Sequence, residues 1–221
     1  MKSFPRGPLW LALCVVLADQ AIKIYIKTAF YFGESREIFP WFHLHFTENP
    51  GMAFGMEWGG LEGKLALTIF RILAIGGILW WGRQQWLLHT HSQLTNPVPL
   101  ASAKTPVLFY AIALILAGAL GNVLDSVLYG QLFDRGLTYD ASFESWLPYT
   151  GLALWGGNYA PPLLGNVVDM LYFPLWKGDL PSWIPFWGGD YFVFFRPIFN
   201  IADAAISCGV GLYIVSQWKR K

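Results

Sequence analysis

Polar residues interrupt three long apolar stretches of this sequence, and they do so in pairs three or four positions apart. The pairs are Asp19 and Lys23, Asn122 and Asp125, and Asn200 and Asp203. At this spacing both side chains of a pair lie on the same face of a helix. An ionisable residue inside a membrane costs about 2.5–3.5 kcal/mol on insertion scales, and it usually faces protein or a water-filled cavity. The three polar stripes are therefore expected to converge on one shared site.

Carboxylates held close together can hydrolyse an amide without a metal or a nucleophilic serine. The two groups cannot both ionise easily, so they share one proton and their pKa values separate. The ionised member takes a proton from water, and the protonated member donates to the carbonyl oxygen. Position on the expected membrane helices favours Asp125 with Asp203 as such a pair. Asp169, in the apolar stretch 165–173, can return to the same depth from outside these helices.

The composition predicts an integral membrane protein. Of the 221 residues, 55% are hydrophobic and only 13% are charged, whereas about a quarter are charged in a typical soluble domain. The formal net charge is +1, which gives no indication of a nucleic-acid partner. The histidines and cysteines show no metal-ligand spacing, so no metal or other cofactor is expected.

Four stretches are long and apolar enough to cross a bilayer, which takes about 20 residues as a helix. They are residues 9–26, 65–81, 107–129 and 198–218. Basic residues near both termini, and between the second and third stretches, assign these regions to the cytoplasm by the positive-inside rule. The expected fold is an α-helical integral membrane protein. Residues 1–221 form a single membrane domain, with segments 28–64 and 130–196 on the outer side.

The two outer segments differ in character. Residues 38–58 alternate aromatic and polar positions around a Pro-Gly turn, which predicts short strands and hence a small extracytoplasmic β platform. Residues 138–196 are rich in Pro, Gly and Trp. Because Trp and Tyr favour the membrane–water interface, we expect an interfacial segment of loops and short helices there.

Four short motifs, taken in their order along the chain, resemble those of the lipoprotein signal peptidase (signal peptidase II) family. The motifs are Asp19-Gln20-x-x-Lys23, Asn49-Pro50-Gly51-Met52-Ala53-Phe54, the run GALGNVLD from Gly118 to Asp125, and Val167-Val168-Asp169 followed by Phe199-Asn200-Ile201-Ala202-Asp203. The match extends from the first expected helix to the fourth. The wide separation between Asp125 and Asp169 resembles the longer Bacteroidetes-type form of this family.

This resemblance implies a metal-free aspartyl endopeptidase that removes signal peptides from diacylglyceryl-modified prolipoproteins. Such an enzyme would lie in the cell inner (cytoplasmic) membrane as a multi-pass protein, with both termini cytoplasmic and its active site near the periplasmic face. Its implied partners are lipid-modified prolipoproteins and membrane lipids, and it is expected to act as a monomer. The family's cyclic-peptide inhibitor globomycin is expected to block it.

The resemblance also implies roles for individual residues. The V-x-D and F-N-x-A-D motifs imply that Asp169 and Asp203 form the catalytic pair. Substrate-binding or supporting roles are expected for Asn49, Gly51, Asn122, Asp125, Asn200, Asp19 and Lys23. The rival catalytic pair is Asp125 with Asp203.

One departure from the family pattern lies directly after Asp125. The family usually has Arg at that position, whereas this chain has Ser126. A contact made by that Arg must be absent or replaced, and Arg135 and Arg196 are the candidates. Arg71, alone in the second apolar stretch, is given a structural role.

Two other classes of function are open on the residues alone. The polar pairs could serve only to hydrogen-bond helices together, in a membrane scaffold whose outer segment binds a partner. The intramembrane charges could also form the ion relay of a small transporter or channel. A relay predicts polar residues at several depths, however, and the inner halves of the first, third and fourth stretches are almost wholly apolar.

Overall fold

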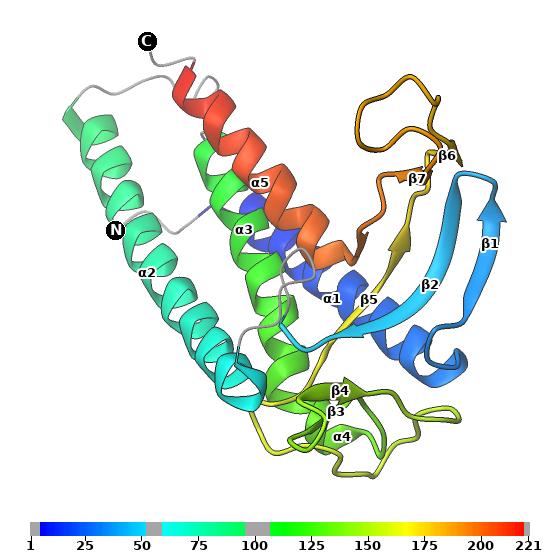
Figure 1. Cartoon of the computed structure of the whole chain (residues 1–221). Helices are drawn as coiled ribbons and strands as arrows, with labels where there is room; N and C mark the ends of the chain where they lie inside the picture. Colours follow the sequence, from blue (N-terminus) through cyan, green and yellow to red (C-terminus); the bar gives the residue numbers. More distant parts are fainter. Residues whose placement is uncertain (1–4, 52–58, 96–106, 219–221) are drawn as a thin grey trace.

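The computed structural model describes residues 5–51, 59–95 and 107–218. Within these ranges, four helices are long and apolar enough to cross a membrane, as the sequence predicts. They are α1 (Arg6–Ala29), α2 (Gly60–Thr95), α3 (Val107–Leu124) and α5 (Ile201–Trp218). Figure 1 shows them as a bundle in which α3 contacts the other three helices, with a small sheet beside α1 and the beginning of α5.

Several helix boundaries differ by a few residues from those expected, and two of the differences have a clear cause. Helix α2 continues well past residue 81, because the polar residues there end the apolar run without breaking the helix. Helix α5 begins at Ile201 and not at residue 198, since Asn200 caps it: the backbone N–H of Asp203 donates to Asn200 Oδ1 at 2.9 Å. Helix α3 runs on through a π-helical turn, η2 (Asp125–Tyr129), and a short α4 (Gly130–Leu132).

Glycines allow the central helices to approach closely. A Cβ atom on Gly118 of α3 would lie 2.2 Å from the backbone oxygen of Ala202 in α5. A Cβ atom on Gly121 would lie 2.7 Å from a carboxylate oxygen of Asp19 in α1. Small residues of this kind let membrane helices pack backbone against backbone. The close approach brings the polar stripes of α1, α3 and α5 together.

A four-stranded antiparallel sheet confirms the expected β platform. Its strands, in spatial order, are β1 (Ser35–Phe39), β2 (Phe42–Asn49), β5 (Val167–Tyr172) and β8 (Ile198–Phe199). Strand β2 ends at Asn49, and residues 52–58 of the expected platform, including Met52, Ala53 and Phe54, lie outside the described residues. The sheet joins both outer segments to the start of α5.

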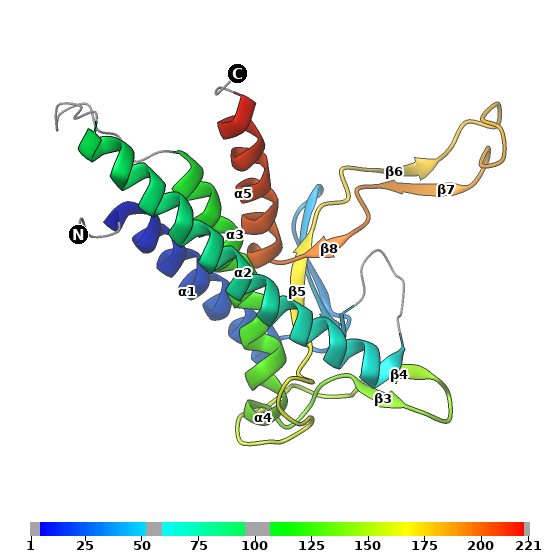
Figure 2. The same ribbon diagram turned by 90° about the vertical axis from the view of Figure 1, so that its left-hand side faces the viewer.

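The segment 130–196 contains loops, as expected, but strands take the place of most of the expected short helices. Two hairpins form there, β3 (Thr138–Asp140) with β4 (Ser145–Leu147), and β6 (Trp176–Asp179) with β7 (Tyr191–Phe194). Aromatic and β-branched residues, which favour the pleated conformation, are common in these runs. Figure 2 shows the β6–β7 hairpin extending away from the helices.

Apolar side chains fill a core between the bundle and the sheet and also cover the outside of the bundle. The core includes Ile26, Phe46, Tyr129, Phe133 and Met170, all at most 1% exposed. The outer faces of the helices expose large apolar side chains, among them Trp10, Leu17, Phe70, Leu73 and Trp80. These faces suit contact with lipid, since the side chains have no protein to cover them.

Candidate active site

The sheet brings Asp169 to the first turn of α5. Asp169 pairs with Thr47 of β2, and two residues further along β5, Leu171 pairs with Phe199 of β8. Because β8 leads directly into α5, this pairing places Asp169 beside the residues that open the helix. Asp169 is 3% exposed.

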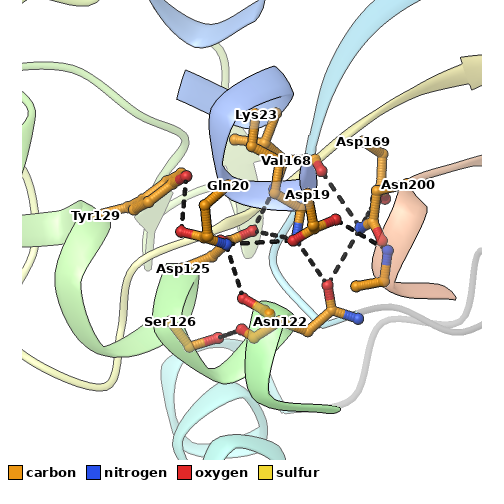
Figure 3. A network of polar contacts seen from close by, with 12 residues as sticks. Asp19, Gln20, Lys23, Asn122, Asp125, Ser126, Tyr129, Val168, Asp169 and Asn200 are labelled. Carbon is orange, nitrogen blue, oxygen red and sulfur yellow. Dashed lines mark hydrogen bonds and ion pairs between the residues drawn. The ribbon is translucent and has the colours of Figure 1, made fainter. Parts of the chain in front are cut away.

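Asn200 links the two aspartates that the motifs assign to catalysis. Its Nδ2 donates to Asp169 Oδ1 at 2.6 Å, and its Oδ1 accepts from the backbone N–H of Asp203 at 2.9 Å. The Asn200 side chain also reaches Asn122 Oδ1 at 3.2 Å. One fully buried amide therefore fixes Asp169 and the turn that carries Asp203, as Figure 3 shows for Asp169 and Asn200.

Asn122 of α3 holds the other side of Asp203. Its Nδ2 donates to Asp203 Oδ1 at 2.8 Å, and its Oδ1 accepts from Lys23 Nζ at 2.9 Å. The amide orientation is thus set by a cation on one side and a carboxylate on the other. Asp203 is half-buried, in contrast to the buried Asp169.

Lys23 lies at the centre of a buried ion-pair group. Its Nζ is 2.9 Å from Asp19 Oδ2 and 2.8 Å from Asp125 Oδ2, and these three side chains are at most 1% exposed. The second oxygen of Asp19 accepts the backbone N–H of Ala202 at 2.9 Å, which ties α1 to the start of α5. The two carboxylates therefore fix three elements around one ammonium group (Figure 3).

Asp125, the rival catalytic residue, has partners on both oxygens. Besides Lys23, it accepts Gln20 Nε2 at 2.9 Å and the backbone N–H of Val168 at 3.2 Å. Gln20 in turn accepts from the hydroxyl of Tyr129 at 3.2 Å. These contacts join α1, η2 and β5 and leave Asp125 engaged in support. Gln20 was absent from the expected site residues, although it lies within the first motif.

The electrostatic setting of Asp169 favours its protonated form. Burial, followed by the charge of Asp203, raises the pKa of the Asp169 carboxyl to about 8, against opposing effects of Lys23 and of hydrogen bonds from Asn200 and Asn49. Burial raises the pKa of a carboxyl because the charged form loses hydration, and a neighbouring carboxylate adds to the shift. A pKa of about 8 favours the protonated form of the Asp169 carboxyl at neutral pH.

Asn49 is the last residue of β2, which pairs with the strand that carries Asp169, and Gly51 follows two residues later. Asn49 pairs with Val167 of β5, and its side-chain Oδ1 accepts the backbone N–H of Gly51 at 2.8 Å. Gly51 has φ of +112°, a conformation that favours glycine. The Asn49 side chain also hydrogen-bonds the carboxyl of Asp169. The motif that contains these residues thus reaches the site directly.

A second buried polar network, which the sequence analysis missed, lies next to the first. Glu48 is paired with Lys27 of α1 and accepts hydrogen bonds from Leu137 N at 2.8 Å, Asn166 Nδ2 at 2.9 Å and the Tyr149 hydroxyl at 3.1 Å. These bonds tie the outer segment to β2 and α1. The sequence does indicate a role for Lys27, because it follows Lys23 by four positions and so lies on the same helix face.

Lys64 of α2 joins this second network to the Asn49 turn. Its Nζ donates to Asn166 Oδ1 at 2.8 Å and to the backbone oxygen of Pro50 at 3.3 Å. Lys64 is 4% exposed. From sequence alone, a charge that anchors a turn, as that of Lys64 does, cannot be distinguished from one that faces water.

Two arginines bear on the position after Asp125, where the family usually has Arg. Ser126, where the family usually has Arg, is buried and donates to Asn122 O at 3.1 Å. Arg135 is engaged by Asp134 and the Thr150 backbone oxygen. Arg71 of α2, which was given a structural role from sequence, interacts electrostatically with the carboxylates of Asp203, Asp169 and Asp125. Helix α2 therefore supplies a positive charge that acts on the aspartates, whereas α3 has Ser126 at the position of the family Arg.

The arrangement suits hydrolysis by side-chain carboxylates. It contains one buried carboxyl with a raised pKa, one less buried carboxyl, two amides that hydrogen-bond them, and the ion-pair group of Lys23 next to them. Within the described ranges, no group of three or more His, Cys, Asp or Glu residues is placed to hold a metal ion.

Comparison with known proteins gives the same family as the motifs. The family model for signal peptidase (SPase) II matches residues 11–219. A protein of Porphyromonas gingivalis named "Lipoprotein signal peptidase" is 41% identical over 218 residues, which cover 97% of this chain and 85% of the relative. One of Amoebophilus asiaticus with the same name is 36% identical, over 94% of this chain and 75% of the relative.

Two solved structures titled as a bacterial membrane enzyme share the fold. One has a TM-score of 0.55 and covers 100% of this chain and 97% of its own, and the other has a TM-score of 0.52 and covers 99% and 91%. Both are 24% identical in sequence to this chain. The resemblance drawn from the four motifs is confirmed, and the chain belongs to the signal peptidase II family.

Proposed function

We propose that this lipoprotein signal peptidase removes the signal peptide of diacylglyceryl-modified prolipoproteins with Asp169 and Asp203 as its water-activating pair. The observation that carries this assignment is the Asn200 side chain, which bonds Asp169 at 2.6 Å and the Asp203 backbone at 2.9 Å. Family membership favours this function over the transporter and scaffold alternatives.

The reaction needs one base and one acid. Asp203, ionised, takes a proton from water as the water oxygen attacks the scissile carbonyl carbon, and Asp169 donates its proton to the carbonyl oxygen. In the resulting tetrahedral diol, Asp203 passes its proton to the amide nitrogen as the C–N bond breaks. Asp169 recovers a proton from a hydroxyl group as the new carboxyl forms, so both residues return to their starting states.

The remaining site residues divide into two groups by their contacts. Asn122 and Asn200 orient the catalytic carboxyls, while Asn49 and Gly51 lie beside Asp169 where an extended substrate backbone would be held. The ion-pair group of Asp19, Lys23 and Asp125 supports the site from behind, because its carboxylate oxygens are already occupied.

The four apolar helices and the positions of the basic residues support the membrane setting that we propose. We assign the enzyme to the cell inner membrane as a monomer with residues 1–221 in one membrane domain. Both termini then lie in the cytoplasm, and segments 28–64 and 130–196 lie at the periplasmic face with the active site. There the lipid chains of the substrate remain in the outer leaflet while its scissile bond reaches the site. Globomycin is expected to inhibit cleavage.

A cleavage assay on a lipidated prolipoprotein peptide tests the assignment. Purified Asp169→Asn and Asp203→Asn variants should give no product while remaining folded. Asp140→Asn is the matched control, because its amide oxygen can still accept the 2.8 Å bond from Ser142 N, and it should cleave normally. Substantial residual cleavage by either of the first two variants would reject the pair.

Two further measurements test the rival catalytic pair and the metal-free mechanism. Asp125→Asn should be less stable, yet its folded fraction should still cleave. If Asp125→Asn abolishes cleavage while Asp169→Asn retains it, the rival pair of Asp125 and Asp203 is correct. Cleavage should persist in the presence of a metal chelator, and its loss would contradict a mechanism based on side-chain carboxyls alone.

A further inference from the structure

The β6–β7 hairpin, here called the aromatic hairpin (residues 175–195), meets the rest of the fold near its base, where Lys177 lies over the ring of Tyr172 and Phe195 packs against Phe199. Its two strands pair only with each other, from Trp176 with Phe194 to Asp179 with Tyr191. Figure 2 shows it extending sideways from the end of β5 and β8, with no helix beside it. A lone two-stranded hairpin is at best marginally stable in water, so a further contact is needed.

Large apolar side chains are exposed along the whole aromatic hairpin. They are Leu175, Trp176, Trp183, Phe186, Trp187, Tyr191, Phe192, Phe194 and Phe195. Single exposed apolar residues are ordinary, but a contiguous exposed set marks an interaction surface. Phe186 is the extreme case, since its side chain is 96% exposed.

The tip of the aromatic hairpin is ordered by its own hydrogen bonds. Leu180 and Asp190 close it through Leu180 N to Asp190 O at 2.9 Å, and Gly188 N donates to Ile184 O at 3.0 Å. Phe186 has φ of +71°, a left-handed conformation that is unfavourable for a bulky side chain. The fold thus presents an aromatic ring outward at a backbone position that would suit glycine better.

Sequence and position identify the surface that the tip meets. Residues 180–189 contain no ionisable side chain but include two Trp and one Phe. Trp is enriched where a membrane meets water. The hairpin returns through β8 into Ile201, the first residue of a membrane-spanning helix. Its base therefore lies at the level where α5 enters the bilayer.

We propose that the tip of the aromatic hairpin inserts into the interfacial region of the outer leaflet of the membrane. The hairpin connects β5, which carries Asp169, to β8 and the turn that carries Asp203. Lipid contact at the tip therefore fixes the height of both aspartates relative to the bilayer surface. This role concerns placement of the site and rests on the membrane orientation given above, and it is measured separately from catalysis.

A depth measurement tests insertion directly. In a background with Cys14→Ser and Cys208→Ser, a fluorescent label is attached at Phe186→Cys and the enzyme is placed in phosphatidylcholine vesicles. Lipids that carry a nitroxide near the headgroup should quench this label, and aqueous iodide should not. Ser142→Cys, on the β3–β4 turn that lies near the start of α2 in Figure 2, is the matched control and should show the reverse. Iodide quenching of both labels alike would overturn the proposal.

An activity measurement then tests the consequence. The combined change of Trp183, Phe186 and Trp187 to Ser should lower cleavage several-fold in vesicles and leave it near normal in detergent micelles. Phe143→Ser, which removes an aromatic side chain 73% exposed on the other hairpin, should have no effect in either. Equal loss in micelles and vesicles would overturn a lipid role for the tip, even if Asp169 and Asp203 prove catalytic.

Discussion

Replacement of Lys23 by Met removes the cation of the ion-pair group and keeps a side chain of similar length. Lys23 Nζ lies 2.9 Å from Asp19 and 2.8 Å from Asp125, with all three side chains at most 1% exposed. Removal of one partner from a buried ion pair costs about 3–5 kcal/mol, because a charge remains buried without compensation. Since 1.36 kcal/mol is a factor of ten, the unfolding equilibrium should shift by roughly two to four decades.

Reversible unfolding in mixed micelles, followed by tryptophan fluorescence, measures this loss. The matched control is Lys177→Met, because Lys177 is exposed on β6 and its side chain contacts only the ring of Tyr172, at 6.0 Å, among the described interactions. A change at such a surface position is expected to stay within about 0.5 kcal/mol. The difference between the two variants isolates the buried pair from the general loss of a positive charge.

A double variant tests the physical cause. If uncompensated carboxylates produce the loss, Lys23→Met combined with Asp125→Asn should be more stable than Lys23→Met alone, because one buried charge has been neutralised. Residues that share one ion-pair group are expected to be non-additive in this way. The reasoning is refuted if Lys23→Met unfolds like Lys177→Met, or if the two losses simply add.

Three further changes probe the site and its supports. Cleavage should fall as pH rises through about 8, because burial raises the pKa of Asp169 to about 8 and the proton of this carboxyl is lost above that value. Between the ordinary pKa of Asp and pH 8 only the folded state holds this proton, so the free energy of unfolding should also fall as pH rises through that range. A pH–rate profile that stays flat above pH 8 would contradict the prediction. Gly118→Ala should separate α3 from α5 and lower the unfolding midpoint, because the added methyl would lie 2.2 Å from a backbone oxygen, whereas Gly211→Ala meets no atom within 4 Å and should be neutral or stabilising. Glu48→Gln should cost about 3–5 kcal/mol, because Lys27 is left without its carboxylate, and limited proteolysis should cut the outer segment sooner.

The helical part of the site can be predicted from sequence because local spacing determines it. Residues four apart, such as Asp19 and Lys23, share a helix face wherever the helix lies. The cost of buried polar groups then favours convergence of the stripes, and the structure joins Lys23 to Asn122 at 2.9 Å and Asn122 to Asp203 at 2.8 Å. These contacts need no knowledge of the loops.

The position of Asp169 cannot be obtained in this way, because it depends on pairing between distant segments. Strand β5 is buried along Val167–Met170, and a short apolar run of this kind does not distinguish a strand from a buried helix. Its partner β2 lies more than a hundred positions earlier in the chain. Spacing alone therefore favoured Asp125, and only the family motif indicated Asp169.

One face of α1 supports both polar networks. Asp19, Lys23 and Lys27 follow one another at intervals of four residues. Lys23 pairs with Asp19 and Asp125, and Lys27 pairs with Glu48. Glu48 pairs in the β2–β5 ladder with Val168, directly before Asp169. The bonds from Glu48 to the outer segment therefore act on the same strand pair that carries Asp169. The long outer segment is thus hydrogen-bonded to the strand pair that carries Asp169, and loosening it at Glu48 should disturb catalysis as well as stability.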